Sequence, residues 1–495
     1  MLNFILAIQS KAVNILKQNS IAVTTTIFLA SVTGLILLSQ QQQQLHYFST
    51  VEAGEAECID YDLTENTIAI NCDASFLDVV ETINEPDILE STGNGEYILN
   101  ANLEVADDVT FEMTSSSNDD NSRLQYLKIT GANGIIVHGT ILIDGVKITS
   151  WDTSANDVIQ QDINDGSIRC AFIQFDGSEG SQIINSEFGY LGYQELGKRG
   201  FDLWGPDASY SGEGSSHDMQ IIGSEFHNMW FAFYSRGAYN VVVDGNEYHH
   251  NIKYALDPHS GTRDMTITNN WLYNNPIGVV CSDQCSNTLI EGNEIENNTI
   301  AGIFFSRNMH DSIARNNQIY NSTIGITVSE SSNNQIYNNT IEAAASSGIR
   351  LVHLEPIRDG ETENNLVYNN TISNSENGIR VTRSNNNNNT VENHIFSNIT
   401  TSEYVLSGNA GIRIKEQHFD DALIRQEGSA TNNTVEIVDS GIIEVTEGES
   451  DGGGEEDDGN GEDEEEGEGN LYNTDNEPFR RILSDGDSIT VNSLS

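Results

Sequence analysis

The chain has 495 residues and a formal net charge of −53, set by 75 acidic and 22 basic side chains. Nucleic-acid binding needs clustered Lys and Arg, so this balance excludes nucleic acid as a partner. The same charge repels any polyanion at long range. A site for an acidic polymer must therefore gather its few cations locally.

The N-terminal 45 residues are predicted to be an export signal or membrane anchor. Residues 21–38 carry no charge, Lys11 and Lys17 precede them, and no acidic residue appears before Glu52. Basic residues before such a segment keep the N-terminus inside and place the rest of the chain outside. No clean small-x-small cleavage site follows, which slightly favours an uncleaved anchor over a cleaved signal. Both predict a protein outside the cytoplasm, either secreted or held on the outer face of the membrane.

The five cysteines are typical of an oxidising compartment. Cys58 and Cys72 flank an apparent hairpin in residues 46–94, a predicted cap or lead-in, and are expected to pair. Cys281 and Cys285 are close enough in sequence to bridge a short loop, with a metal site as the weaker alternative. Cys170 is left over.

The middle of the chain repeats with a period of about 23 residues. Apolar strand segments recur with their first residues at positions 232, 255, 278, 302, 325, 348 and 378. Short β-branched strands alternate with Gly or Asn turns, and no helix-length apolar period appears. Such units bury their apolar residues only by stacking. Residues 95–435 are therefore predicted to form an all-β, right-handed parallel β-helix, a pectate-lyase-like solenoid. Asn suits its turns, because it tolerates left-handed geometry and its amide can bond to neighbouring coils.

The C-terminal residues 436–495 are predicted to be a disordered acidic linker and tail. Residues 451–470 are Gly, Asp and Glu apart from two Asn. A segment of this composition cannot bury enough apolar surface to order itself.

The repeat register places ionisable residues in one column of the stacked coils. Tyr234 and Asp257 lie two positions after their anchors, and Arg236, His259 and Arg307 lie four or five positions after theirs. Most other coils hold Ser, Thr or Val there. Such a concentration of ionisable groups in apolar surroundings indicates a functional site.

The segment Tyr254-Ala-Leu-Asp-Pro-His259 is the centre of the predicted site. Residues 257 and 259 share one face of a strand, because side chains alternate in a strand. Pro258 cannot donate to the sheet, which makes this coil locally irregular. A lone His is more often structural, but His259 with Asp257, Tyr254 and two arginines favours function.

At this point the sequence resembles the mannuronan (alginate) C5-epimerases, especially the periplasmic, biosynthetic type. The resemblance covers about residues 95–330 and rests on residues 226–234, 241–248, 251–259 and 277–282. Those enzymes carry a Tyr-Gly-Ile/Phe-Asp-Pro-His motif on a right-handed β-helix. The resemblance implies that His259 removes the C5 proton, that Asp257 orients it or binds substrate, and that Tyr254 is an acid or positioner.

The chain departs from that pattern at Asp283, where the family has an arginine that neutralises the substrate carboxylate. Arg236 and Arg307 are the candidates to replace it. The remaining predicted substrate-binding residues are Tyr234, Asp202, Lys253 and Asp283 itself.

Stabilising the enolate-like state of a uronate demands a cation and hydrogen-bond donors beside the carboxylate. The lead hypothesis is C5-epimerisation of a polyuronate by proton removal and return. A lyase shares the first half-reaction, and a non-catalytic glycan-binding β-helix is the hypothesis from another class. A glycoside hydrolase is third, with Asp202 and Asp257 as its carboxylate pair. The partner is then an anionic polysaccharide, the chain is expected to be a monomer, and no cofactor is required, with calcium left open.

Overall fold

The computed structural model describes residues 57–115, 123–162, 166–204, 215–353, 360–382 and 386–407. Beyond these it describes the strand segments 413–416, 422–427, 433–437, 441–448, 479–483 and 488–491. The predicted anchor and the acidic run 451–470 lie outside the described residues. No helix among the described residues is long and apolar enough to cross a membrane.

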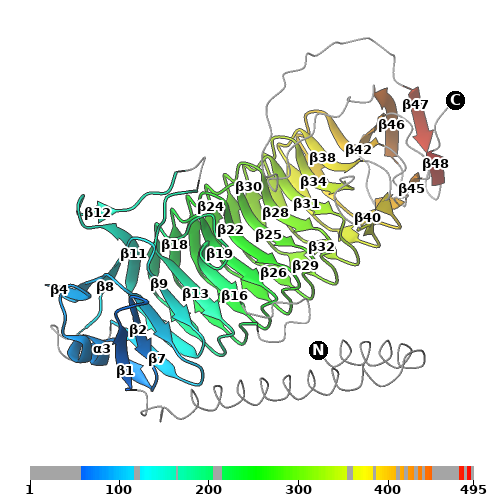
Figure 1. Cartoon of the computed structure of the whole chain (residues 1–495). Helices are drawn as coiled ribbons and strands as arrows, with labels where there is room; N and C mark the ends of the chain where they lie inside the picture. The colour runs from blue at the N-terminus through cyan, green and yellow to red at the C-terminus, as the bar shows by residue number, and fades with distance from the viewer. Residues whose placement is uncertain are drawn as a thin grey trace, which may run out of the picture. The chain divides into compact units, whose positions relative to one another are not determined.

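Three parallel sheets run the length of a stack of coils (Figure 1). Sheet 1 contains β1(Ile59–Asp62), β2(Thr67–Ile70), β6(Asn102–Val105), β9(Gly134–Val137), β13(Phe172–Asp176), β16(Gly200–Trp204), β19(Phe231–Arg236), β22(Tyr254–His259), β25(Ile277–Ser282), β28(Ala301–Ser306), β31(Ile324–Ser329), β34(Ser347–Val352), β38(Asn377–Thr382), β42(Ser402–Ser407), β44(Ala422–Glu427), β46(Gly441–Gly448) and β47(Phe479–Leu483).

Sheet 2 contains β3(Ala74–Ser75), β7(Thr110–Thr114), β10(Thr140–Asp144), β14(Gln182–Ile184), β17(Gln220–Ile222), β20(Val242–Asp244), β23(Thr266–Thr268), β26(Leu289–Glu291), β29(Ile313–Arg315), β32(Gln335–Tyr337), β36(Leu366–Tyr368), β40(Thr390–Glu392), β43(Arg413–Glu416), β45(Asn433–Ile437) and β48(Ser488–Val491).

Sheet 3 contains β4(Leu89–Gly93), β5(Glu96–Leu99), β8(Tyr126–Thr130), β11(Lys147–Asp152), β12(Asp157–Val158), β15(Glu187–Gly189), β18(Glu225–His227), β21(Glu247–His249), β24(Trp271–Tyr273), β27(Glu294–Glu296), β30(Gln318–Tyr320), β33(Thr340–Glu342), β37(Thr371–Ser373) and β41(Ile395–Ser397). The short pair β35(Thr362–Glu363) and β39(Asn386–Asn387) lies apart from the three sheets.

The parallel β-helix predicted from the repeat is confirmed. Each strand pairs with the strand one coil on, as in β19–β22, β22–β25 and β25–β28. Inward side chains form one continuous core cluster that extends from Ile59 to Ile414. Parallel pairing already begins with β2 and β6, before the predicted start at residue 95. The helix α3(Phe76–Ile83) follows in the same N-terminal coils, with Ser75 as its N-cap.

Asn residues stabilise the turns in two ways: some adopt the left-handed backbone, and others form hydrogen bonds between coils. The prediction from the sequence had assigned both roles to the same residues. The first Asn of an Asn-Asn pair adopts a left-handed backbone, as Asn269 does with φ 54°. The second is buried, and its amide bonds to the next coil. Asn270 donates its backbone N–H and its Nδ2 to Asn293 Oδ1, each at 2.9 Å, and Asn293 does the same toward Asn317. This ladder satisfies buried polar groups in the coils between Asn246 and Asn389.

Two predictions about the ends of the fold and its cysteines need correction. Strands β46, β47 and β48 lie within the predicted disordered tail, where β46 continues the stack and β47 pairs antiparallel with it. The sequence there has β-branched apolar residues at positions 442, 443 and 445, which favour a strand over a solvated tail. The Cys58–Cys72 pair is present, with Cα atoms 5.1 Å apart. Cys281 and Cys285 are not bridged.

The two unbridged cysteines are fully buried core residues. The thiol of Cys285 donates to the carbonyl oxygens of Pro258 at 3.2 Å and Ser282 at 3.3 Å. A buried thiol with such acceptors behaves as a small packing group. The prediction of a disulfide between Cys281 and Cys285 is wrong. It rested on their closeness in sequence, whereas both side chains pack in the core as free thiols.

Candidate active site

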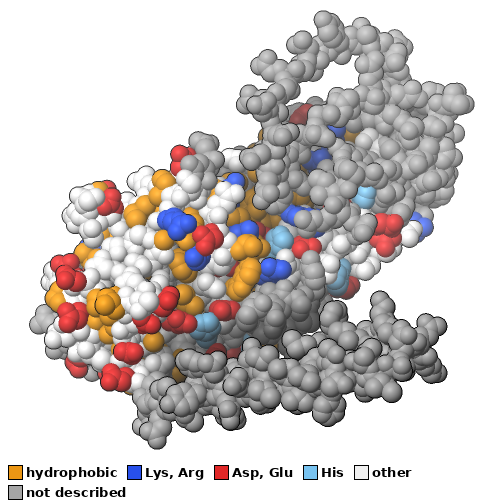
Figure 2. Space-filling view, viewed as in Figure 1, with side chains coloured by type: hydrophobic (Ala, Val, Ile, Leu, Met, Phe, Trp, Pro, Cys, Tyr) orange, Lys and Arg blue, Asp and Glu red, His pale blue; other side chains and the backbone are white. Residues whose placement is uncertain are grey.

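The outer face of sheet 1 brings the predicted residues together in two columns. Strand register pairs Asp202 with Tyr234 and Tyr234 with Asp257. It also pairs Arg236 with His259, and His259 with Ser282. The column proposed from the repeat is therefore present, with adjacent coils separated by about 4.8 Å. Figure 2 shows Lys, Arg and His side chains gathered over the middle of the stack, while Asp and Glu dominate its N-terminal end.

Two carboxyl groups in the first column are buried. Asp202 is 0% exposed and Asp257 is 3% exposed. Burial raises the pKa of Asp257 to about 8, against the attraction of Arg199 and Arg307. Burial likewise raises the pKa of Asp202 to about 7, against Arg199. Asp257 is therefore mostly protonated at neutral pH, and a neutral carboxylic acid can donate a hydrogen bond.

Arg199 is a site residue that the sequence analysis missed. Its guanidinium carbon lies 4.2 Å from the ring centroid of Tyr234 and 5.2 Å from that of Phe231. Its backbone N–H lies 3.4 Å from Asp202 Oδ2, and its charge acts on both buried carboxyls. A signal was present, since Arg199 directly precedes the strand that carries Asp202.

Gly200 allows the backbone conformation that places Arg199 beside Tyr234 and Asp202. Gly200 has φ 143°, and a Cβ at this position would lie 2.2 Å from the carbonyl oxygen of Phe231. Phe231 in turn donates its N–H to the Arg199 carbonyl at 2.9 Å. Only glycine allows this close approach of the two coils. The register then shifts between Gly200 and Asp202, an irregularity that no periodic pattern predicts.

His259 ends strand β22 with its side chain 18% exposed. Its ring lies against Tyr234, with centroids 5.6 Å apart. Its Nδ1 is 2.6 Å from Ser260 Oγ and 3.9 Å from Asp283 Oδ2. Asp283 thus lies next to the candidate base, whereas the sequence predicted it only as a substrate-binding residue.

Tyr254 belongs to an apolar cluster on the outside of sheet 1, and Lys253 lies beside that cluster. This cluster consists of Trp230, Phe231, Tyr234, Tyr254, Ile277, Val280, Ala301 and Phe304. The Tyr254 ring meets Phe231 edge to face, and Lys253 Nζ lies 5.1 Å from the Trp230 ring. Tyr234, which belongs to the cluster and also contacts His259, becomes the stronger candidate for a proton donor. Burial raises the pKa of Tyr234 above its usual value, against the opposing effect of Arg199.

Several polar atoms around His259 have no hydrogen-bond partner among the described residues. They are Asp202 Oδ1, Asp257 Oδ1, Ser282 Oγ, Arg236 Nε, and Nε and Nη2 of Arg307. Buried polar atoms in native proteins are nearly always paired, so such a group calls for an explanation. A bound ligand with carboxylate and hydroxyl groups would satisfy them. Arg236 also lies over the Trp204 ring, 5.1 Å from its centroid.

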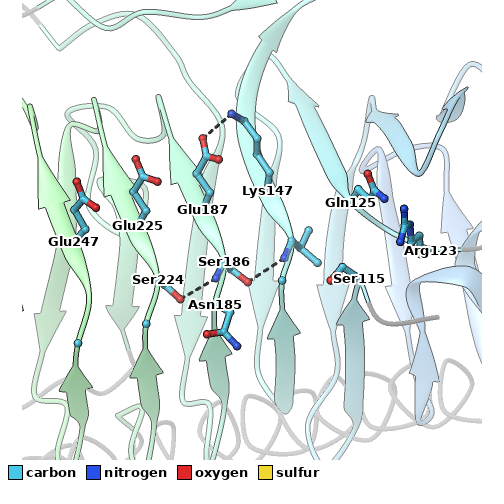
Figure 3. Close-up of a pocket in the computed structure, with 14 residues that line it drawn as sticks. Ser115, Arg123, Gln125, Lys147, Asn185, Ser186, Glu187, Ser224, Glu225 and Glu247 are labelled. Atoms are coloured by element: carbon cyan, nitrogen blue, oxygen red, sulfur yellow. Dashed lines mark hydrogen bonds and ion pairs between the residues drawn. The ribbon is translucent and has the colours of Figure 1, made fainter. Parts of the chain in front are cut away.

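A hollow of about 640 Å³ lies elsewhere, between sheets 2 and 3 (Figure 3). Glu187, Glu225 and Glu247 line it from three successive strands, and Lys147 reaches toward Glu187. Hydrogen bonding by His227, and then by Lys147, lowers the pKa of Glu187 to about 2, against the opposing effect of burial. Its carboxylates repel a polyuronate, so this hollow does not compete with the site on sheet 1.

Among the residues that the structure describes, two groups of side chains could share a metal ion, each with its ligand atoms within 4.8 Å of one another. They are Glu179, His217 and Asp218, and Glu225, Glu247 and His249. Neither includes a residue from the two columns on sheet 1.

The family model described as right handed beta helix region matches residues 70–319, 211–355 and 310–447. The chain is 27% identical over 205 residues to a mannuronan C5-epimerase of Pseudomonas syringae pv. tomato, covering 40% of this chain and 37% of that protein. It is 26% identical over 155 residues to a mannuronan C5-epimerase of Pseudomonas fluorescens, covering 30% and 29%. The chain thus spans 37% of the length of the first relative and 29% of the length of the second.

Among solved structures, the crystal structure of the periplasmic alginate epimerase AlgG superposes with a TM-score of 0.58. The two chains are 21% identical, and the match covers 71% of this chain and 85% of the other. At this identity the likeness shows the fold.

Proposed function

The chain belongs to the right-handed β-helix family, and from that premise we propose that it is a C5-epimerase of a polyuronate such as mannuronan. The relatives named as mannuronan C5-epimerases support the proposal. The observation that carries it is the set of buried polar atoms of Asp257, Arg307 and the neighbouring columns that have no hydrogen-bond partner among the described residues. These atoms match the carboxylate and hydroxyl groups of a uronate chain.

The chemical difficulty is the low acidity of the C5 proton. Removing it sends the electron pair of the C5–H bond toward the C6 carboxylate, which must accept further negative charge. Arg199 and Arg307 both act electrostatically on Asp257, so two cations lie close to this position. Protonated Asp257 adds a hydrogen-bond donor. Preorganised donors and cations of this kind are typically the largest contribution to such catalysis.

His259 is the proposed base, and its partial exposure at the end of β22 gives substrate access to it. A base within hydrogen-bond reach contributes roughly 10²–10⁴-fold. Tyr234, which its raised pKa keeps protonated, or a water, returns a proton to the opposite face of C5. The bond broken and the bond formed are both C5–H, so the product is the C5 epimer with an intact chain.

A lyase is the alternative, because the same intermediate cleaves the chain when the 4-O-linked sugar leaves before the proton returns. Incubation of mannuronan in heavy water distinguishes the two. The epimerase incorporates deuterium at C5 without new chain ends, as seen by proton NMR. Ultraviolet absorbance from unsaturated uronate would contradict epimerisation and indicate the lyase.

His259→Ala tests whether the site carries the reaction, with Asp264→Asn, at an exposed carboxylate outside the site, as the control that retains the base. Loss of deuterium incorporation in the first variant is expected. Equal activity in His259→Ala and the parent, or none in the parent with retained polymer binding, would indicate a non-catalytic glycan-binding β-helix.

The proposal extends to the location and cofactors of the protein. A polyuronate substrate, residues 21–38 and a cysteine pair agree with a place outside the cytoplasm, secreted or anchored. The reaction described requires no cofactor. Running the assay with and without calcium tests its dependence, and a requirement would direct attention to the two carboxylate–imidazole groups.

A further inference from the structure

The strands of sheet 1 around the site end in a stack of left-handed turns. Ser260, Asp283, Arg307 and Glu330 follow β22, β25, β28 and β31 with φ between 46° and 61°. Left-handed backbone is unfavourable for residues other than glycine, so the surroundings must stabilise it. Ser260 donates its N–H to the Ser282 carbonyl at 3.1 Å, and Asp283 donates to Ser306 at 3.3 Å. These bonds hold the backbones of Ser260 and Asp283 in neighbouring coils.

The two side chains connect to His259 in one chain of hydrogen bonds. Ser260 Oγ donates to Asp283 Oδ2 at 3.1 Å and lies 2.6 Å from His259 Nδ1. The direct distance from Nδ1 to Asp283 Oδ2 is 3.9 Å, too long for a hydrogen bond. Asp283 therefore reaches His259 through the Ser260 hydroxyl.

The proton count in this chain decides the state of the imidazole. A serine hydroxyl has one proton, and here it goes to the carboxylate of Asp283. The oxygen must then accept from His259, which places the imidazole proton on Nδ1. The lone pair is left on Nε2, because the hydrogen bond at one ring nitrogen selects the role of the other.

We propose that Asp283, acting through Ser260, is a positioning residue that holds His259 in the Nδ1–H tautomer and stabilises the imidazolium formed on proton removal. This inference rests on the proposed function for its catalytic meaning, but the tautomer itself is a property of the free protein. Asp283 is 9% exposed, so its charge acts on the imidazolium across a poorly solvated space.

The inference explains the departure of this chain from the epimerase pattern. The position at which the family has a neutralising arginine holds Asp283, which cannot bind a carboxylate. Arg199 and Arg307 already surround Asp257 and can neutralise the substrate. With that role filled, an acid at 283 can serve the base instead of the substrate.

Two variants test the chain of hydrogen bonds without demanding a new backbone. Ser260→Gly removes the hydroxyl and suits φ 46°, while Asp283→Asn keeps the shape, tolerates φ 61° and removes the charge. Asp264→Asn is the matched control. Asp264 also has a left-handed backbone, with φ 54°, but its carboxylate pairs with Arg263. Equal melting temperatures would verify that all three variants fold.

The first measurement is the tautomer of His259, from nitrogen-15 shifts of the labelled protein under conditions in which the imidazole is neutral. The parent and the control should hold the proton on Nδ1, and Ser260→Gly should move most of it to Nε2. An unchanged tautomer in Ser260→Gly would overturn the inference whether or not the protein is an epimerase.

The second measurement is kinetic. Both site variants should lower kcat roughly 10- to 100-fold with little change in KM, as expected for loss of an oriented base. The double variant should be no worse than the poorer single variant, since Asp283 acts on His259 through the Ser260 hydroxyl. A tautomer change in a protein without epimerase activity would sustain the inference about Asp283 and defeat the proposed function. Additive losses, or a rise in KM alone, would contradict the positioning role.

Discussion

The guanidinium of Arg199 lies over the ring of Tyr234, 4.2 Å from its centroid, and so joins the coil before the site to the ring that contacts His259. The same cation acts on Asp202 and Asp257. One arginine therefore reaches three of the groups to which a role is assigned. In a chain with so few basic residues, this placement is the local concentration of positive charge that an acidic substrate requires.

Replacing Arg199 with Ala should lower kcat/KM for mannuronan by roughly 10²–10³-fold, as expected for loss of a preorganised cation. Arg263→Ala is the control, because Arg263 lies over the Tyr239 ring at 4.5 Å without belonging to either column. Steady-state kinetics on both variants check this. Equal losses in the two variants would show that Arg199 acts only through packing.

The buried Asp257 carboxyl predicts a loss of stability as pH rises. Its pKa is about 8 in the folded protein and near 3.8 in the unfolded chain, so the folded state binds the proton more tightly between these values. The contribution is complete below about pH 4 and is lost as pH rises through about 8. Asp257→Asn should therefore show a smaller fall in melting temperature between pH 5 and pH 9 than the parent.

The control for the Asp257→Asn experiment is Asp264→Asn, which removes an exposed carboxylate from the turn that follows β22. It should follow the parent across the whole range. A fall in melting temperature as steep in Asp257→Asn as in the parent would mean that Asp257 is ionised in the folded protein.

The asparagine ladder predicts a large cost for a change that touches no site residue. Asn293→Ala leaves Asn270 without its acceptor and the Ile267 carbonyl without its donor. Each orphaned buried group costs roughly 1–3 kcal/mol, so a loss of about 2–4 kcal/mol in the free energy of unfolding is expected. Gln318→Ala, on an exposed position of β30, should change it by less than about 0.5 kcal/mol. Denaturant unfolding of both variants decides the matter.

His394 occupies the position of an Asn in this ladder and should make the protein acid-sensitive. Asn370 donates its N–H to His394 Nδ1 at 3.3 Å, and His394 Nε2 lies 3.2 Å from the Val367 carbonyl. Burial lowers the pKa of His394 to about 4. The unfolded chain takes up its proton near pH 6.5, so stability falls as pH drops from about 6.5 to about 4.

His394→Asn should restore the ladder and remove that part of the acid sensitivity. The expected difference at pH 4 is on the order of 3 kcal/mol relative to pH 7, measured by denaturant unfolding at the two values. His310→Asn, at an exposed ring paired with Asp311, is the control. The prediction is wrong if both His variants respond to pH as the parent does.

The sequence by itself determined the repeating fold and the register of its middle coils. A period of about 23 residues fixes which positions stack, because parallel strands one coil apart align residue by residue. For that reason the period alone predicted that Arg236 lies beside His259 and that Tyr234 lies beside Asp257. The exchange of Asp283 for an arginine was also visible, since it lies within the same period.

Only the tertiary structure decided what happens where the period breaks. Arg199 enters the site because Gly200 allows two coils to approach closely and the register shifts beside it. The ring of Tyr234 lies against His259, and the Ser260 hydroxyl connects His259 to Asp283. Cys281 and Cys285 stay unbridged in the core. Periodicity specifies backbone register, whereas the direction of a side chain after a left-handed turn depends on contacts with coils distant in sequence.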